Sequence, residues 1–147
     1  FIHAQAGMPE GVTLVPSLHD GLRKADIVSL HMPKLDSGYV LGEAELACLP
    51  PHGIVINAAR GGLIDEDALV AALSNGTLHS AGLDVFEQEP PNTEDPLFQS
   101  NKVVLTPHSA SMTVECAERM AVKAARNVLD YFDATIDPAL IVNADAI

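Results

Sequence analysis

The chain has 147 residues, of which 48% are hydrophobic and 4% aromatic, and its net charge is −12. This size and composition predict one globular α/β domain, or a large piece of one. The negative charge argues against nucleic acid and anionic membrane surfaces as partners, because both are negatively charged. No leader or membrane-spanning apolar run is visible, and the two cysteines, Cys48 and Cys116, form no CxxC pair. We therefore expect a cytoplasmic protein without a metal site.

Four short apolar runs predict the strands of the fold, at 27–30, 53–58, 80–85 and 103–105. Runs of this length with helical segments between them are typical of buried parallel strands joined by crossovers. A weaker apolar piece at 12–15 predicts an additional edge strand.

Capping residues predict three helices. The N-caps and their helices are Ser17 with 18–25, Asp65 with 66–73, and Thr113 with a long amphipathic helix reaching about Phe132. Asn75-Gly76 closes the second helix, as a left-handed cap would. Three prolines predict an irregular loop over 89–99. Residues 133–147 are too few for a domain and predict a return strand or a linker.

Polar side chains follow each of the four predicted strands. They are His31-Met32-Pro33, the segment 57–60, Asp84 with Glu87 and Glu89, and Thr106-Pro107-His108. Because the carboxyl ends of parallel strands share one edge of a sheet, these groups should converge there. The set offers Arg60 as an anion clamp, His108 as an acid or base, and one of three carboxylates to orient the imidazole.

Each of these residues also has a purely structural interpretation. Asp84 alone could cap a turn, and a single histidine is more often structural than catalytic. Gly61-Gly62 fit a turn that brings the backbone close to a ligand, and a plain strand-to-helix turn explains them equally well. The convergence of an arginine, a histidine and acids favours a site. The remaining histidines without such companions are expected on the surface or in packing, namely His3, His19, His52 and His79.

Four segments in order carry a resemblance to a known family: ADIVSLHMP, GIVINAARGGLIDEDALVAALSNG, AGLDVFEQEP and VVLTPHSAS. Together they resemble the NAD-binding domain of the D-isomer-specific 2-hydroxyacid dehydrogenases, which include phosphoglycerate, glycerate and hydroxypyruvate reductases. The resemblance covers most of residues 25–130. It implies a Rossmann-type doubly wound parallel sheet. It also implies an oxidoreductase that moves a hydride between NAD or NADP, with NAD favoured, and a small D-2-hydroxy or 2-oxo acid.

The resemblance implies a catalytic trio of Arg60, Glu89 and His108. Arg60 would hold the substrate carboxylate and polarise the reacting carbonyl oxygen. His108 would exchange the proton, and Glu89 would orient it and stabilise its protonated form. Asp84 would accept a hydrogen bond from the nicotinamide carboxamide. The full set of implied cofactor contacts is Met32, Ala58, Ala59, Arg60, Asp84, His108, Ser109, Ala110 and Ser111.

The G-x-G-x-x-G fingerprint of dinucleotide binding is absent from this sequence. The resemblance therefore implies a partial fold that lacks the first βαβ unit. Residues 1–132 would form the second part of the cofactor domain, and 133–147 a tail returning towards a largely absent substrate domain.

In the usual strand order 3-2-1-4-5-6, residues 12–15 would be strand 3 and 27–30 would be strand 4, with an unpaired edge. We expect the chain to be inactive alone and to pair with a missing half or in a homodimer. Two alternatives remain open: a non-catalytic dinucleotide-sensing or interaction protein on the same fold, or an inactive truncated remnant.

Overall fold

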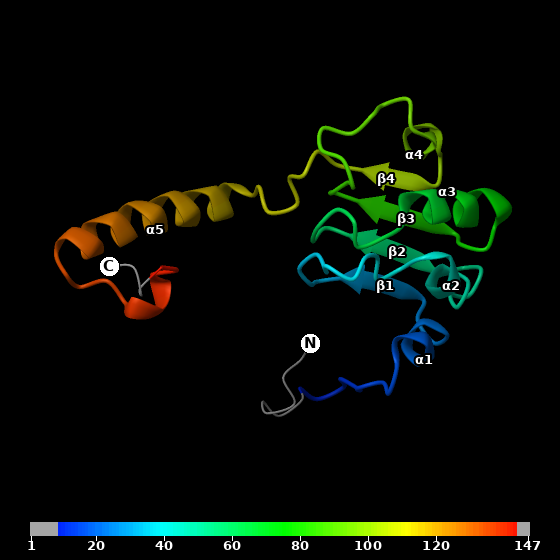
Figure 1. Cartoon of the computed structure of the whole chain (residues 1–147), viewed down its shortest axis with the longest axis horizontal. Coiled ribbons are helices and arrows are strands. Elements are labelled where there is room, and N and C mark those ends of the chain that lie inside the picture. Colours follow the sequence, from blue (N-terminus) through cyan, green and yellow to red (C-terminus); the bar gives the residue numbers. More distant parts are fainter. Residues whose placement is uncertain (1–8, 144–147) are drawn as a thin grey trace. The chain divides into compact units, whose positions relative to one another are not determined.

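The computed structural model describes residues 9–143. The chain forms two compact units, and the boundary between them along the chain falls after Ser109. The first unit is built on a four-stranded sheet with the order β1-β2-β3-β4 (Figure 1). The strands are β1 (Ile27–Leu30), β2 (Ile54–Asn57), β3 (Ser80–Leu83) and β4 (Val103–Leu105). All neighbouring pairs are parallel, which confirms the predicted α/β class.

Helices pack on one face of this sheet and form the core with it. They are α1 (Leu18–Leu22), α2 (Glu43–Leu46), α3 (Glu66–Asn75) and α4 (Pro96–Gln99). Buried leucines of α2, α3 and α4 join side chains of the strands in one cluster, which includes Leu46, Leu69, Leu97, Val55 and Ala81. Burial of this apolar surface is the main force that holds the sheet and helices together.

The predicted caps are confirmed. The side chain of Ser17 accepts a hydrogen bond from the amide of Asp20, and that of Asp65 accepts from the amide of Ala68. Gly76 ends α3 with a φ of +80°, in the left-handed region that glycine adopts without strain.

The structure corrects three of the predictions and adds one helix. Residues 12–15 form no strand, because no described strand lies beside them, and Val12, Leu14 and Val15 are exposed. The first helix ends at Leu22, not at 25, and the Lys24 amide bonds to the Gly21 carbonyl in a tight turn. The predicted loop 89–99 ends in α4, which starts with Asp95 as N-cap and a proline in its first turn, where proline is favoured. Helix α2 was not predicted.

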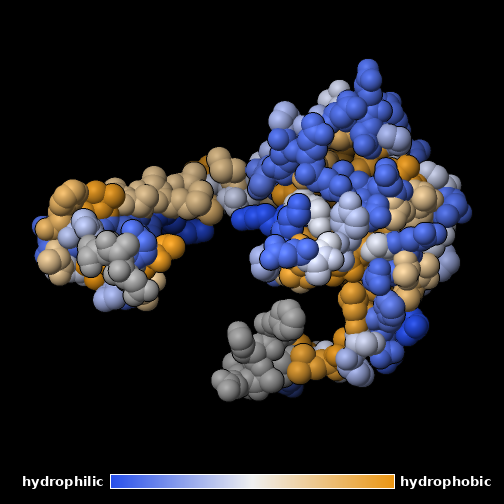
Figure 2. Space-filling model, viewed as in Figure 1, coloured by the Kyte–Doolittle hydropathy of each residue, from blue (hydrophilic) through white to orange (hydrophobic). Residues whose placement is uncertain are grey.

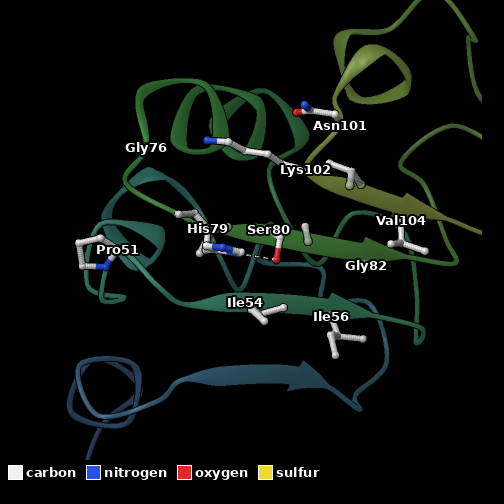
Figure 3. A pocket seen from close by; sticks show the side chains of 13 residues that line it. Pro51, Ile54, Ile56, Gly76, His79, Ser80, Gly82, Asn101, Lys102 and Val104 are labelled. Atoms are coloured by element: carbon white, nitrogen blue, oxygen red, sulfur yellow. Dashed lines mark hydrogen bonds between the residues drawn. The ribbon is translucent and has the colours of Figure 1, made fainter.

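The opposite face of the sheet is not covered by any described helix of the first unit. Its residues include Ile27, Ile56 and Val104, with exposed fractions of 59%, 36% and 71%. Figure 3 shows Ile54, Ile56 and Val104 on this face. Together with Ser80 and Gly82 they line a hollow of about 720 Å³. Strand β1 pairs with β2 alone among the described strands, so the expected open edge is confirmed there.

The second unit contains α5 (Val114–Phe132) and a short 3-10 turn, η1 (Pro138–Leu140). Thr113 caps α5 as predicted, through the amide of Cys116. None of its side chains is buried, and Figure 2 shows hydrophobic residues along this helix. Of the two alternatives predicted for 133–147, a return strand or a linker, no strand forms in the part up to 143, and 144–147 lie outside the described residues. No helix in the described part of the chain is long and apolar enough to cross a membrane.

Candidate active site

The carboxyl ends of β2, β3 and β4 carry the polar residues that the sequence singled out. The turn after β2 is held by Asn57, whose side chain is buried at 2% exposure. Its Oδ1 accepts from the amide of Ala59 at 3.1 Å, and its Nδ2 donates to the carbonyl of Arg60 at 2.9 Å. The Arg60 guanidinium is exposed and donates to the Ala59 carbonyl at 2.7 Å. The turn thus presents a cation at the surface from a fixed backbone.

Gly61 allows this turn to lie directly against the loop that follows β3. A Cβ at position 61 would stand 1.7 Å from the carbonyl oxygen of Phe86, far inside contact distance. The missing side chain at position 61 therefore makes room for the backbone of Phe86. Gly62 has a φ of +75° and turns the chain towards α3.

Asp84 follows β3 and is the second buried polar side chain of the described residues, at 5% exposure. Its Oδ1 accepts from the hydroxyl of Thr106 and from the amide of Ser109, the latter at 2.8 Å. Its own amide donates to the carbonyl of Asn57 at 2.9 Å. Asp84 thus joins the loop after β4 to the ends of β2 and β3.

A hydrogen bond between His108 and Glu89 joins the loops that follow β4 and β3. The Nδ1 of His108 lies 2.8 Å from Oε2 of Glu89, and the other carboxylate oxygen accepts from the Phe86 amide at 3.1 Å. These two hydrogen bonds, the one from His108 above all, lower the pKa of Glu89 below its ordinary 4.5. A carboxylate at Nδ1 makes this nitrogen the donor and leaves Nε2 for another partner.

The backbone of His108 has a φ of +53°, which is uncommon for any residue other than glycine. Conformations of this kind carry strain and cluster at functional sites. A cavity of about 430 Å³ adjoins the pair, with Phe86, Phe98 and Leu105 among its apolar lining residues. An imidazole with a fixed carboxylate beside an apolar hollow is suited to proton exchange with a small bound molecule.

Glu87, which the sequence offered beside Glu89 as a partner for the imidazole, is hydrogen-bonded to other residues. Its Oε1 accepts from the amide of Glu66, and the Glu66 carboxylate accepts from the Glu87 amide at 2.7 Å. Tyr39 donates to the second oxygen of Glu87 at 3.2 Å. Burial raises the pKa of Glu66, outweighing the lowering effect of the hydrogen bond from Glu87. This pair links the start of α3 to the loop that carries Glu89.

The remaining predicted site residues lie as follows. Met32 follows β1 and packs partly buried against the core, as does Ala59, whereas Ala58 is exposed. Ala110 and Ser111 begin the second unit. No direct hydrogen bond joins Arg60 to Glu89 or His108 within residues 9–143. The catalytic and cofactor roles of all these residues stay predictions.

Sequence reasoning assigned no role to Asn57 and Thr106, although both belong to the strand-end groups it identified. Two of the histidines expected on the surface or in packing have acidic partners of their own. His19 pairs with Glu45 and His52 with Asp26, each at 2.9 Å. His3 lies outside the described residues. In the described part of the chain, no cluster of three or more histidine, cysteine, aspartate or glutamate side chains could hold a metal ion.

Residues 3–110 match the D-isomer specific 2-hydroxyacid dehydrogenase family, NAD binding domain. The chain belongs to this family. Over 126 residues it is 43% identical to a glyoxylate reductase from Aeropyrum pernix. The aligned region covers 85% of this chain and 38% of that protein. The chain thus spans about two fifths of the length of the curated relatives it matches.

Solved structures show the same fold. A D-isomer specific 2-hydroxyacid dehydrogenase from Lactobacillus delbrueckii, in its NAD complexed form, has a TM-score of 0.79 and 30% identity over 85% of this chain and 42% of that one. An NADPH-dependent glyoxylate/hydroxypyruvate reductase from Sinorhizobium meliloti, in complex with NADP and malonate, has a TM-score of 0.76 and 36% identity. That match covers 86% of this chain and 40% of the other.

Proposed function

We propose that this chain is part of an oxidoreductase that transfers a hydride between a nicotinamide cofactor and a small D-2-hydroxy or 2-oxo acid. The observation that carries the proposal is the His108–Glu89 pair, at 2.8 Å, on the sheet edge that also holds Arg60 and Asp84. Glyoxylate and hydroxypyruvate are the first substrates to test, since relatives in both comparisons are named for them.

The residues present suit the nicotinamide end of NAD or NADP. Asp84 is a buried carboxylate at the carboxyl end of a central strand, where ligands of open parallel sheets bind. We propose that it accepts a hydrogen bond from the carboxamide, with Met32, Ala58, Ala59, Arg60, His108 and Ser109 as further cofactor contacts. Ala110 and Ser111 stay predicted contacts. Solved relatives hold NAD in one case and NADP in another, and we would test NAD first.

The side chains of this chain would bind the substrate and transfer the proton. When bound, the cofactor supplies or accepts the hydride. His108 would use Nε2 to give a proton to the oxygen of a 2-oxo acid, or to take one from the hydroxyl in the reverse reaction. Glu89 would hold Nδ1 and offset the charge of the imidazolium. Arg60 would bind the substrate carboxylate through two N–H groups and polarise the reacting carbonyl.

We further propose that activity needs more polypeptide than the described first unit, as a homodimer or with a complementary half. The open edge of β1 and the uncovered apolar face support this, because strand edges and apolar faces of parallel sheets are normally covered. A reducing compartment, the cytoplasm, fits the two free cysteines, Cys48 and Cys116.

The test is reduction of glyoxylate and hydroxypyruvate by the complete gene product, followed through the absorbance of NADH or NADPH. Cofactor binding is titrated separately by fluorescence. Turnover that depends on His108 and Arg60 is the expected result. Cofactor binding without turnover of any 2-oxo acid would favour a non-catalytic dinucleotide-sensing protein. Absence of both would favour an inactive remnant.

A further inference from the structure

The amide side chain of Asn57 lies at the point where β2 becomes the Arg60 turn. Burying an amide costs free energy unless its polar atoms are hydrogen-bonded. Both hydrogen bonds of this side chain run forward into the same turn, to the amide of Ala59 and the carbonyl of Arg60. Since the first partner is a donor and the second an acceptor, only one orientation of the amide satisfies both.

On the other side of Arg60, packing and not a side-chain hydrogen bond restrains the described chain. Two glycines follow it, and glycine leaves the backbone the largest choice of conformations. The fixed points of the turn are therefore Asn57 on one side and the contact of Gly61 with the Phe86 carbonyl on the other. Arg60 itself is exposed, and its guanidinium is bonded only within the turn among the described residues.

We infer that Asn57 is a positioning residue for Arg60, which fixes the backbone from which the guanidinium reaches the carboxylate of the substrate. This rests on the proposed function. Asn57 also bonds Asp84, but through its backbone carbonyl, which every substitution keeps. Replacing the side chain thus removes the clamp on Arg60 and leaves the link between β2 and β3 in place.

A matched control exists at the far end of α3. The side chain of Asn75 accepts from the amide of Thr77 at 2.8 Å and is exposed. It makes the same local type of bond as Asn57 makes to Ala59, without the second bond and away from the site. Asn75→Ala should leave activity unchanged.

The experiment compares Asn57→Ala, Asn57→Ser and Asn75→Ala in the complete gene product, each alone and with Arg60→Ala. The serine variant keeps an acceptor for the Ala59 amide and loses the bond to the Arg60 carbonyl. The readouts are kcat and KM for glyoxylate, and the affinity of the NADH complex for oxamate, a non-reducible 2-oxo acid analogue. Thermal melting and NADH titration establish that each variant folds.

Both Asn57 variants should lower kcat/KM and oxamate affinity about 10- to 100-fold, because small misplacements of a binding group have effects of this size. In the Arg60→Ala background the same changes should have little further effect, since a residue that acts through Arg60 has nothing left to position. Equal losses in both backgrounds, or no loss in either, would overturn the inference while the proposed function stands. A wild-type protein that turns over no 2-oxo acid and binds no oxamate would overturn both.

Discussion

The two ends of the parallel sheet each carry a histidine bonded to a carboxylate, yet their surroundings differ. At the amino end, His52 lies 2.9 Å from Asp26, and their side chains are 67% and 83% exposed. At the carboxyl end, His108 lies 2.8 Å from Glu89, with exposures of 51% and 38%. The distances are nearly equal. A histidine–carboxylate contact is therefore not by itself evidence of a site.

The difference lies in what fixes each carboxylate. The second oxygen of Glu89 is bound by the Phe86 amide, and the same loop is braced by Gly61, Asp84 and the Glu66–Glu87 pair. The amino-end pair has no other side-chain hydrogen bond among the described residues. The carboxyl-end pair is thus held in place by further contacts, whereas a solvated surface pair contributes little even to stability.

The largest expected difference between the two ends is in catalysis. His108→Ala should lower kcat of the complete gene product by about 10²- to 10⁴-fold through loss of proton transfer. His52→Ala is the matched control and should leave kcat unchanged. Steady-state reduction of glyoxylate measures both. Equal effects of the two substitutions would contradict a catalytic role for the carboxyl-end pair.

Arg60→Lys tests whether the carboxyl end recognises a carboxylate by geometry as well as by charge. A lysine keeps the charge but loses the planar fork of the guanidinium. We expect kcat/KM to fall by about 10²-fold, in the range found for losing one transition-state donor. Kinetics equal to wild type in this variant would contradict the role assigned to Arg60.

Gly61→Ala tests the close packing at the carboxyl end. The new Cβ would stand 1.7 Å from the Phe86 carbonyl oxygen, so the two backbones must separate. We expect a loss of about 1–3 kcal/mol in the free energy of unfolding, as for other overpacked sites. Gly53→Ala, at the amino end, would bring a Cβ within 2.9 Å of the Pro50 carbonyl and should cost less. Denaturant unfolding of both variants measures the difference.

The smallest expected effect concerns pH. The folded-state pKa of Glu89 is lowered by His108 and the Phe86 amide, so the stability it contributes is present above its ordinary value of 4.5. That contribution is lost as the pH falls through the lowered folded value. Glu89→Gln should therefore melt at a slightly lower temperature near pH 7 and lose less stability below pH 4.5. Parallel pH dependences of Tm for the variant and wild type would exclude this linkage.

Most of the sheet could be predicted because each strand is an apolar run with a capped helix or a turn beside it. Two short helices could not be predicted from the sequence. Helices α2 and α4 have four residues each, too few to show a helical period, and the prolines near α4 hid its start. The apolar content of 12–15 predicted a strand, but a strand also needs a partner to bond, which a local pattern does not reveal.

The site was predictable in its residue types and less so in its construction. Strand ends in parallel sheets converge, so Arg60, Asp84 and His108 could be grouped without coordinates. The left-handed backbone of His108 and the fit of Gly61 against Phe86 depend on how closely two loops approach, which sequence spacing does not report. The amide of Asn57 could have been noticed as a polar residue closing an apolar strand.

The four strands stand in the sheet in the order in which the ribosome produces them, and β2, β3 and β4 each pair with the strand made just before. Every new strand thus finds its partner already synthesised, which favours growth of the sheet during translation. Protection from amide exchange in nascent chains of increasing length should then extend from β1 towards β4. His108 follows β4, the last strand of the described residues, so its contact with Glu89 cannot form until all four strands have been made.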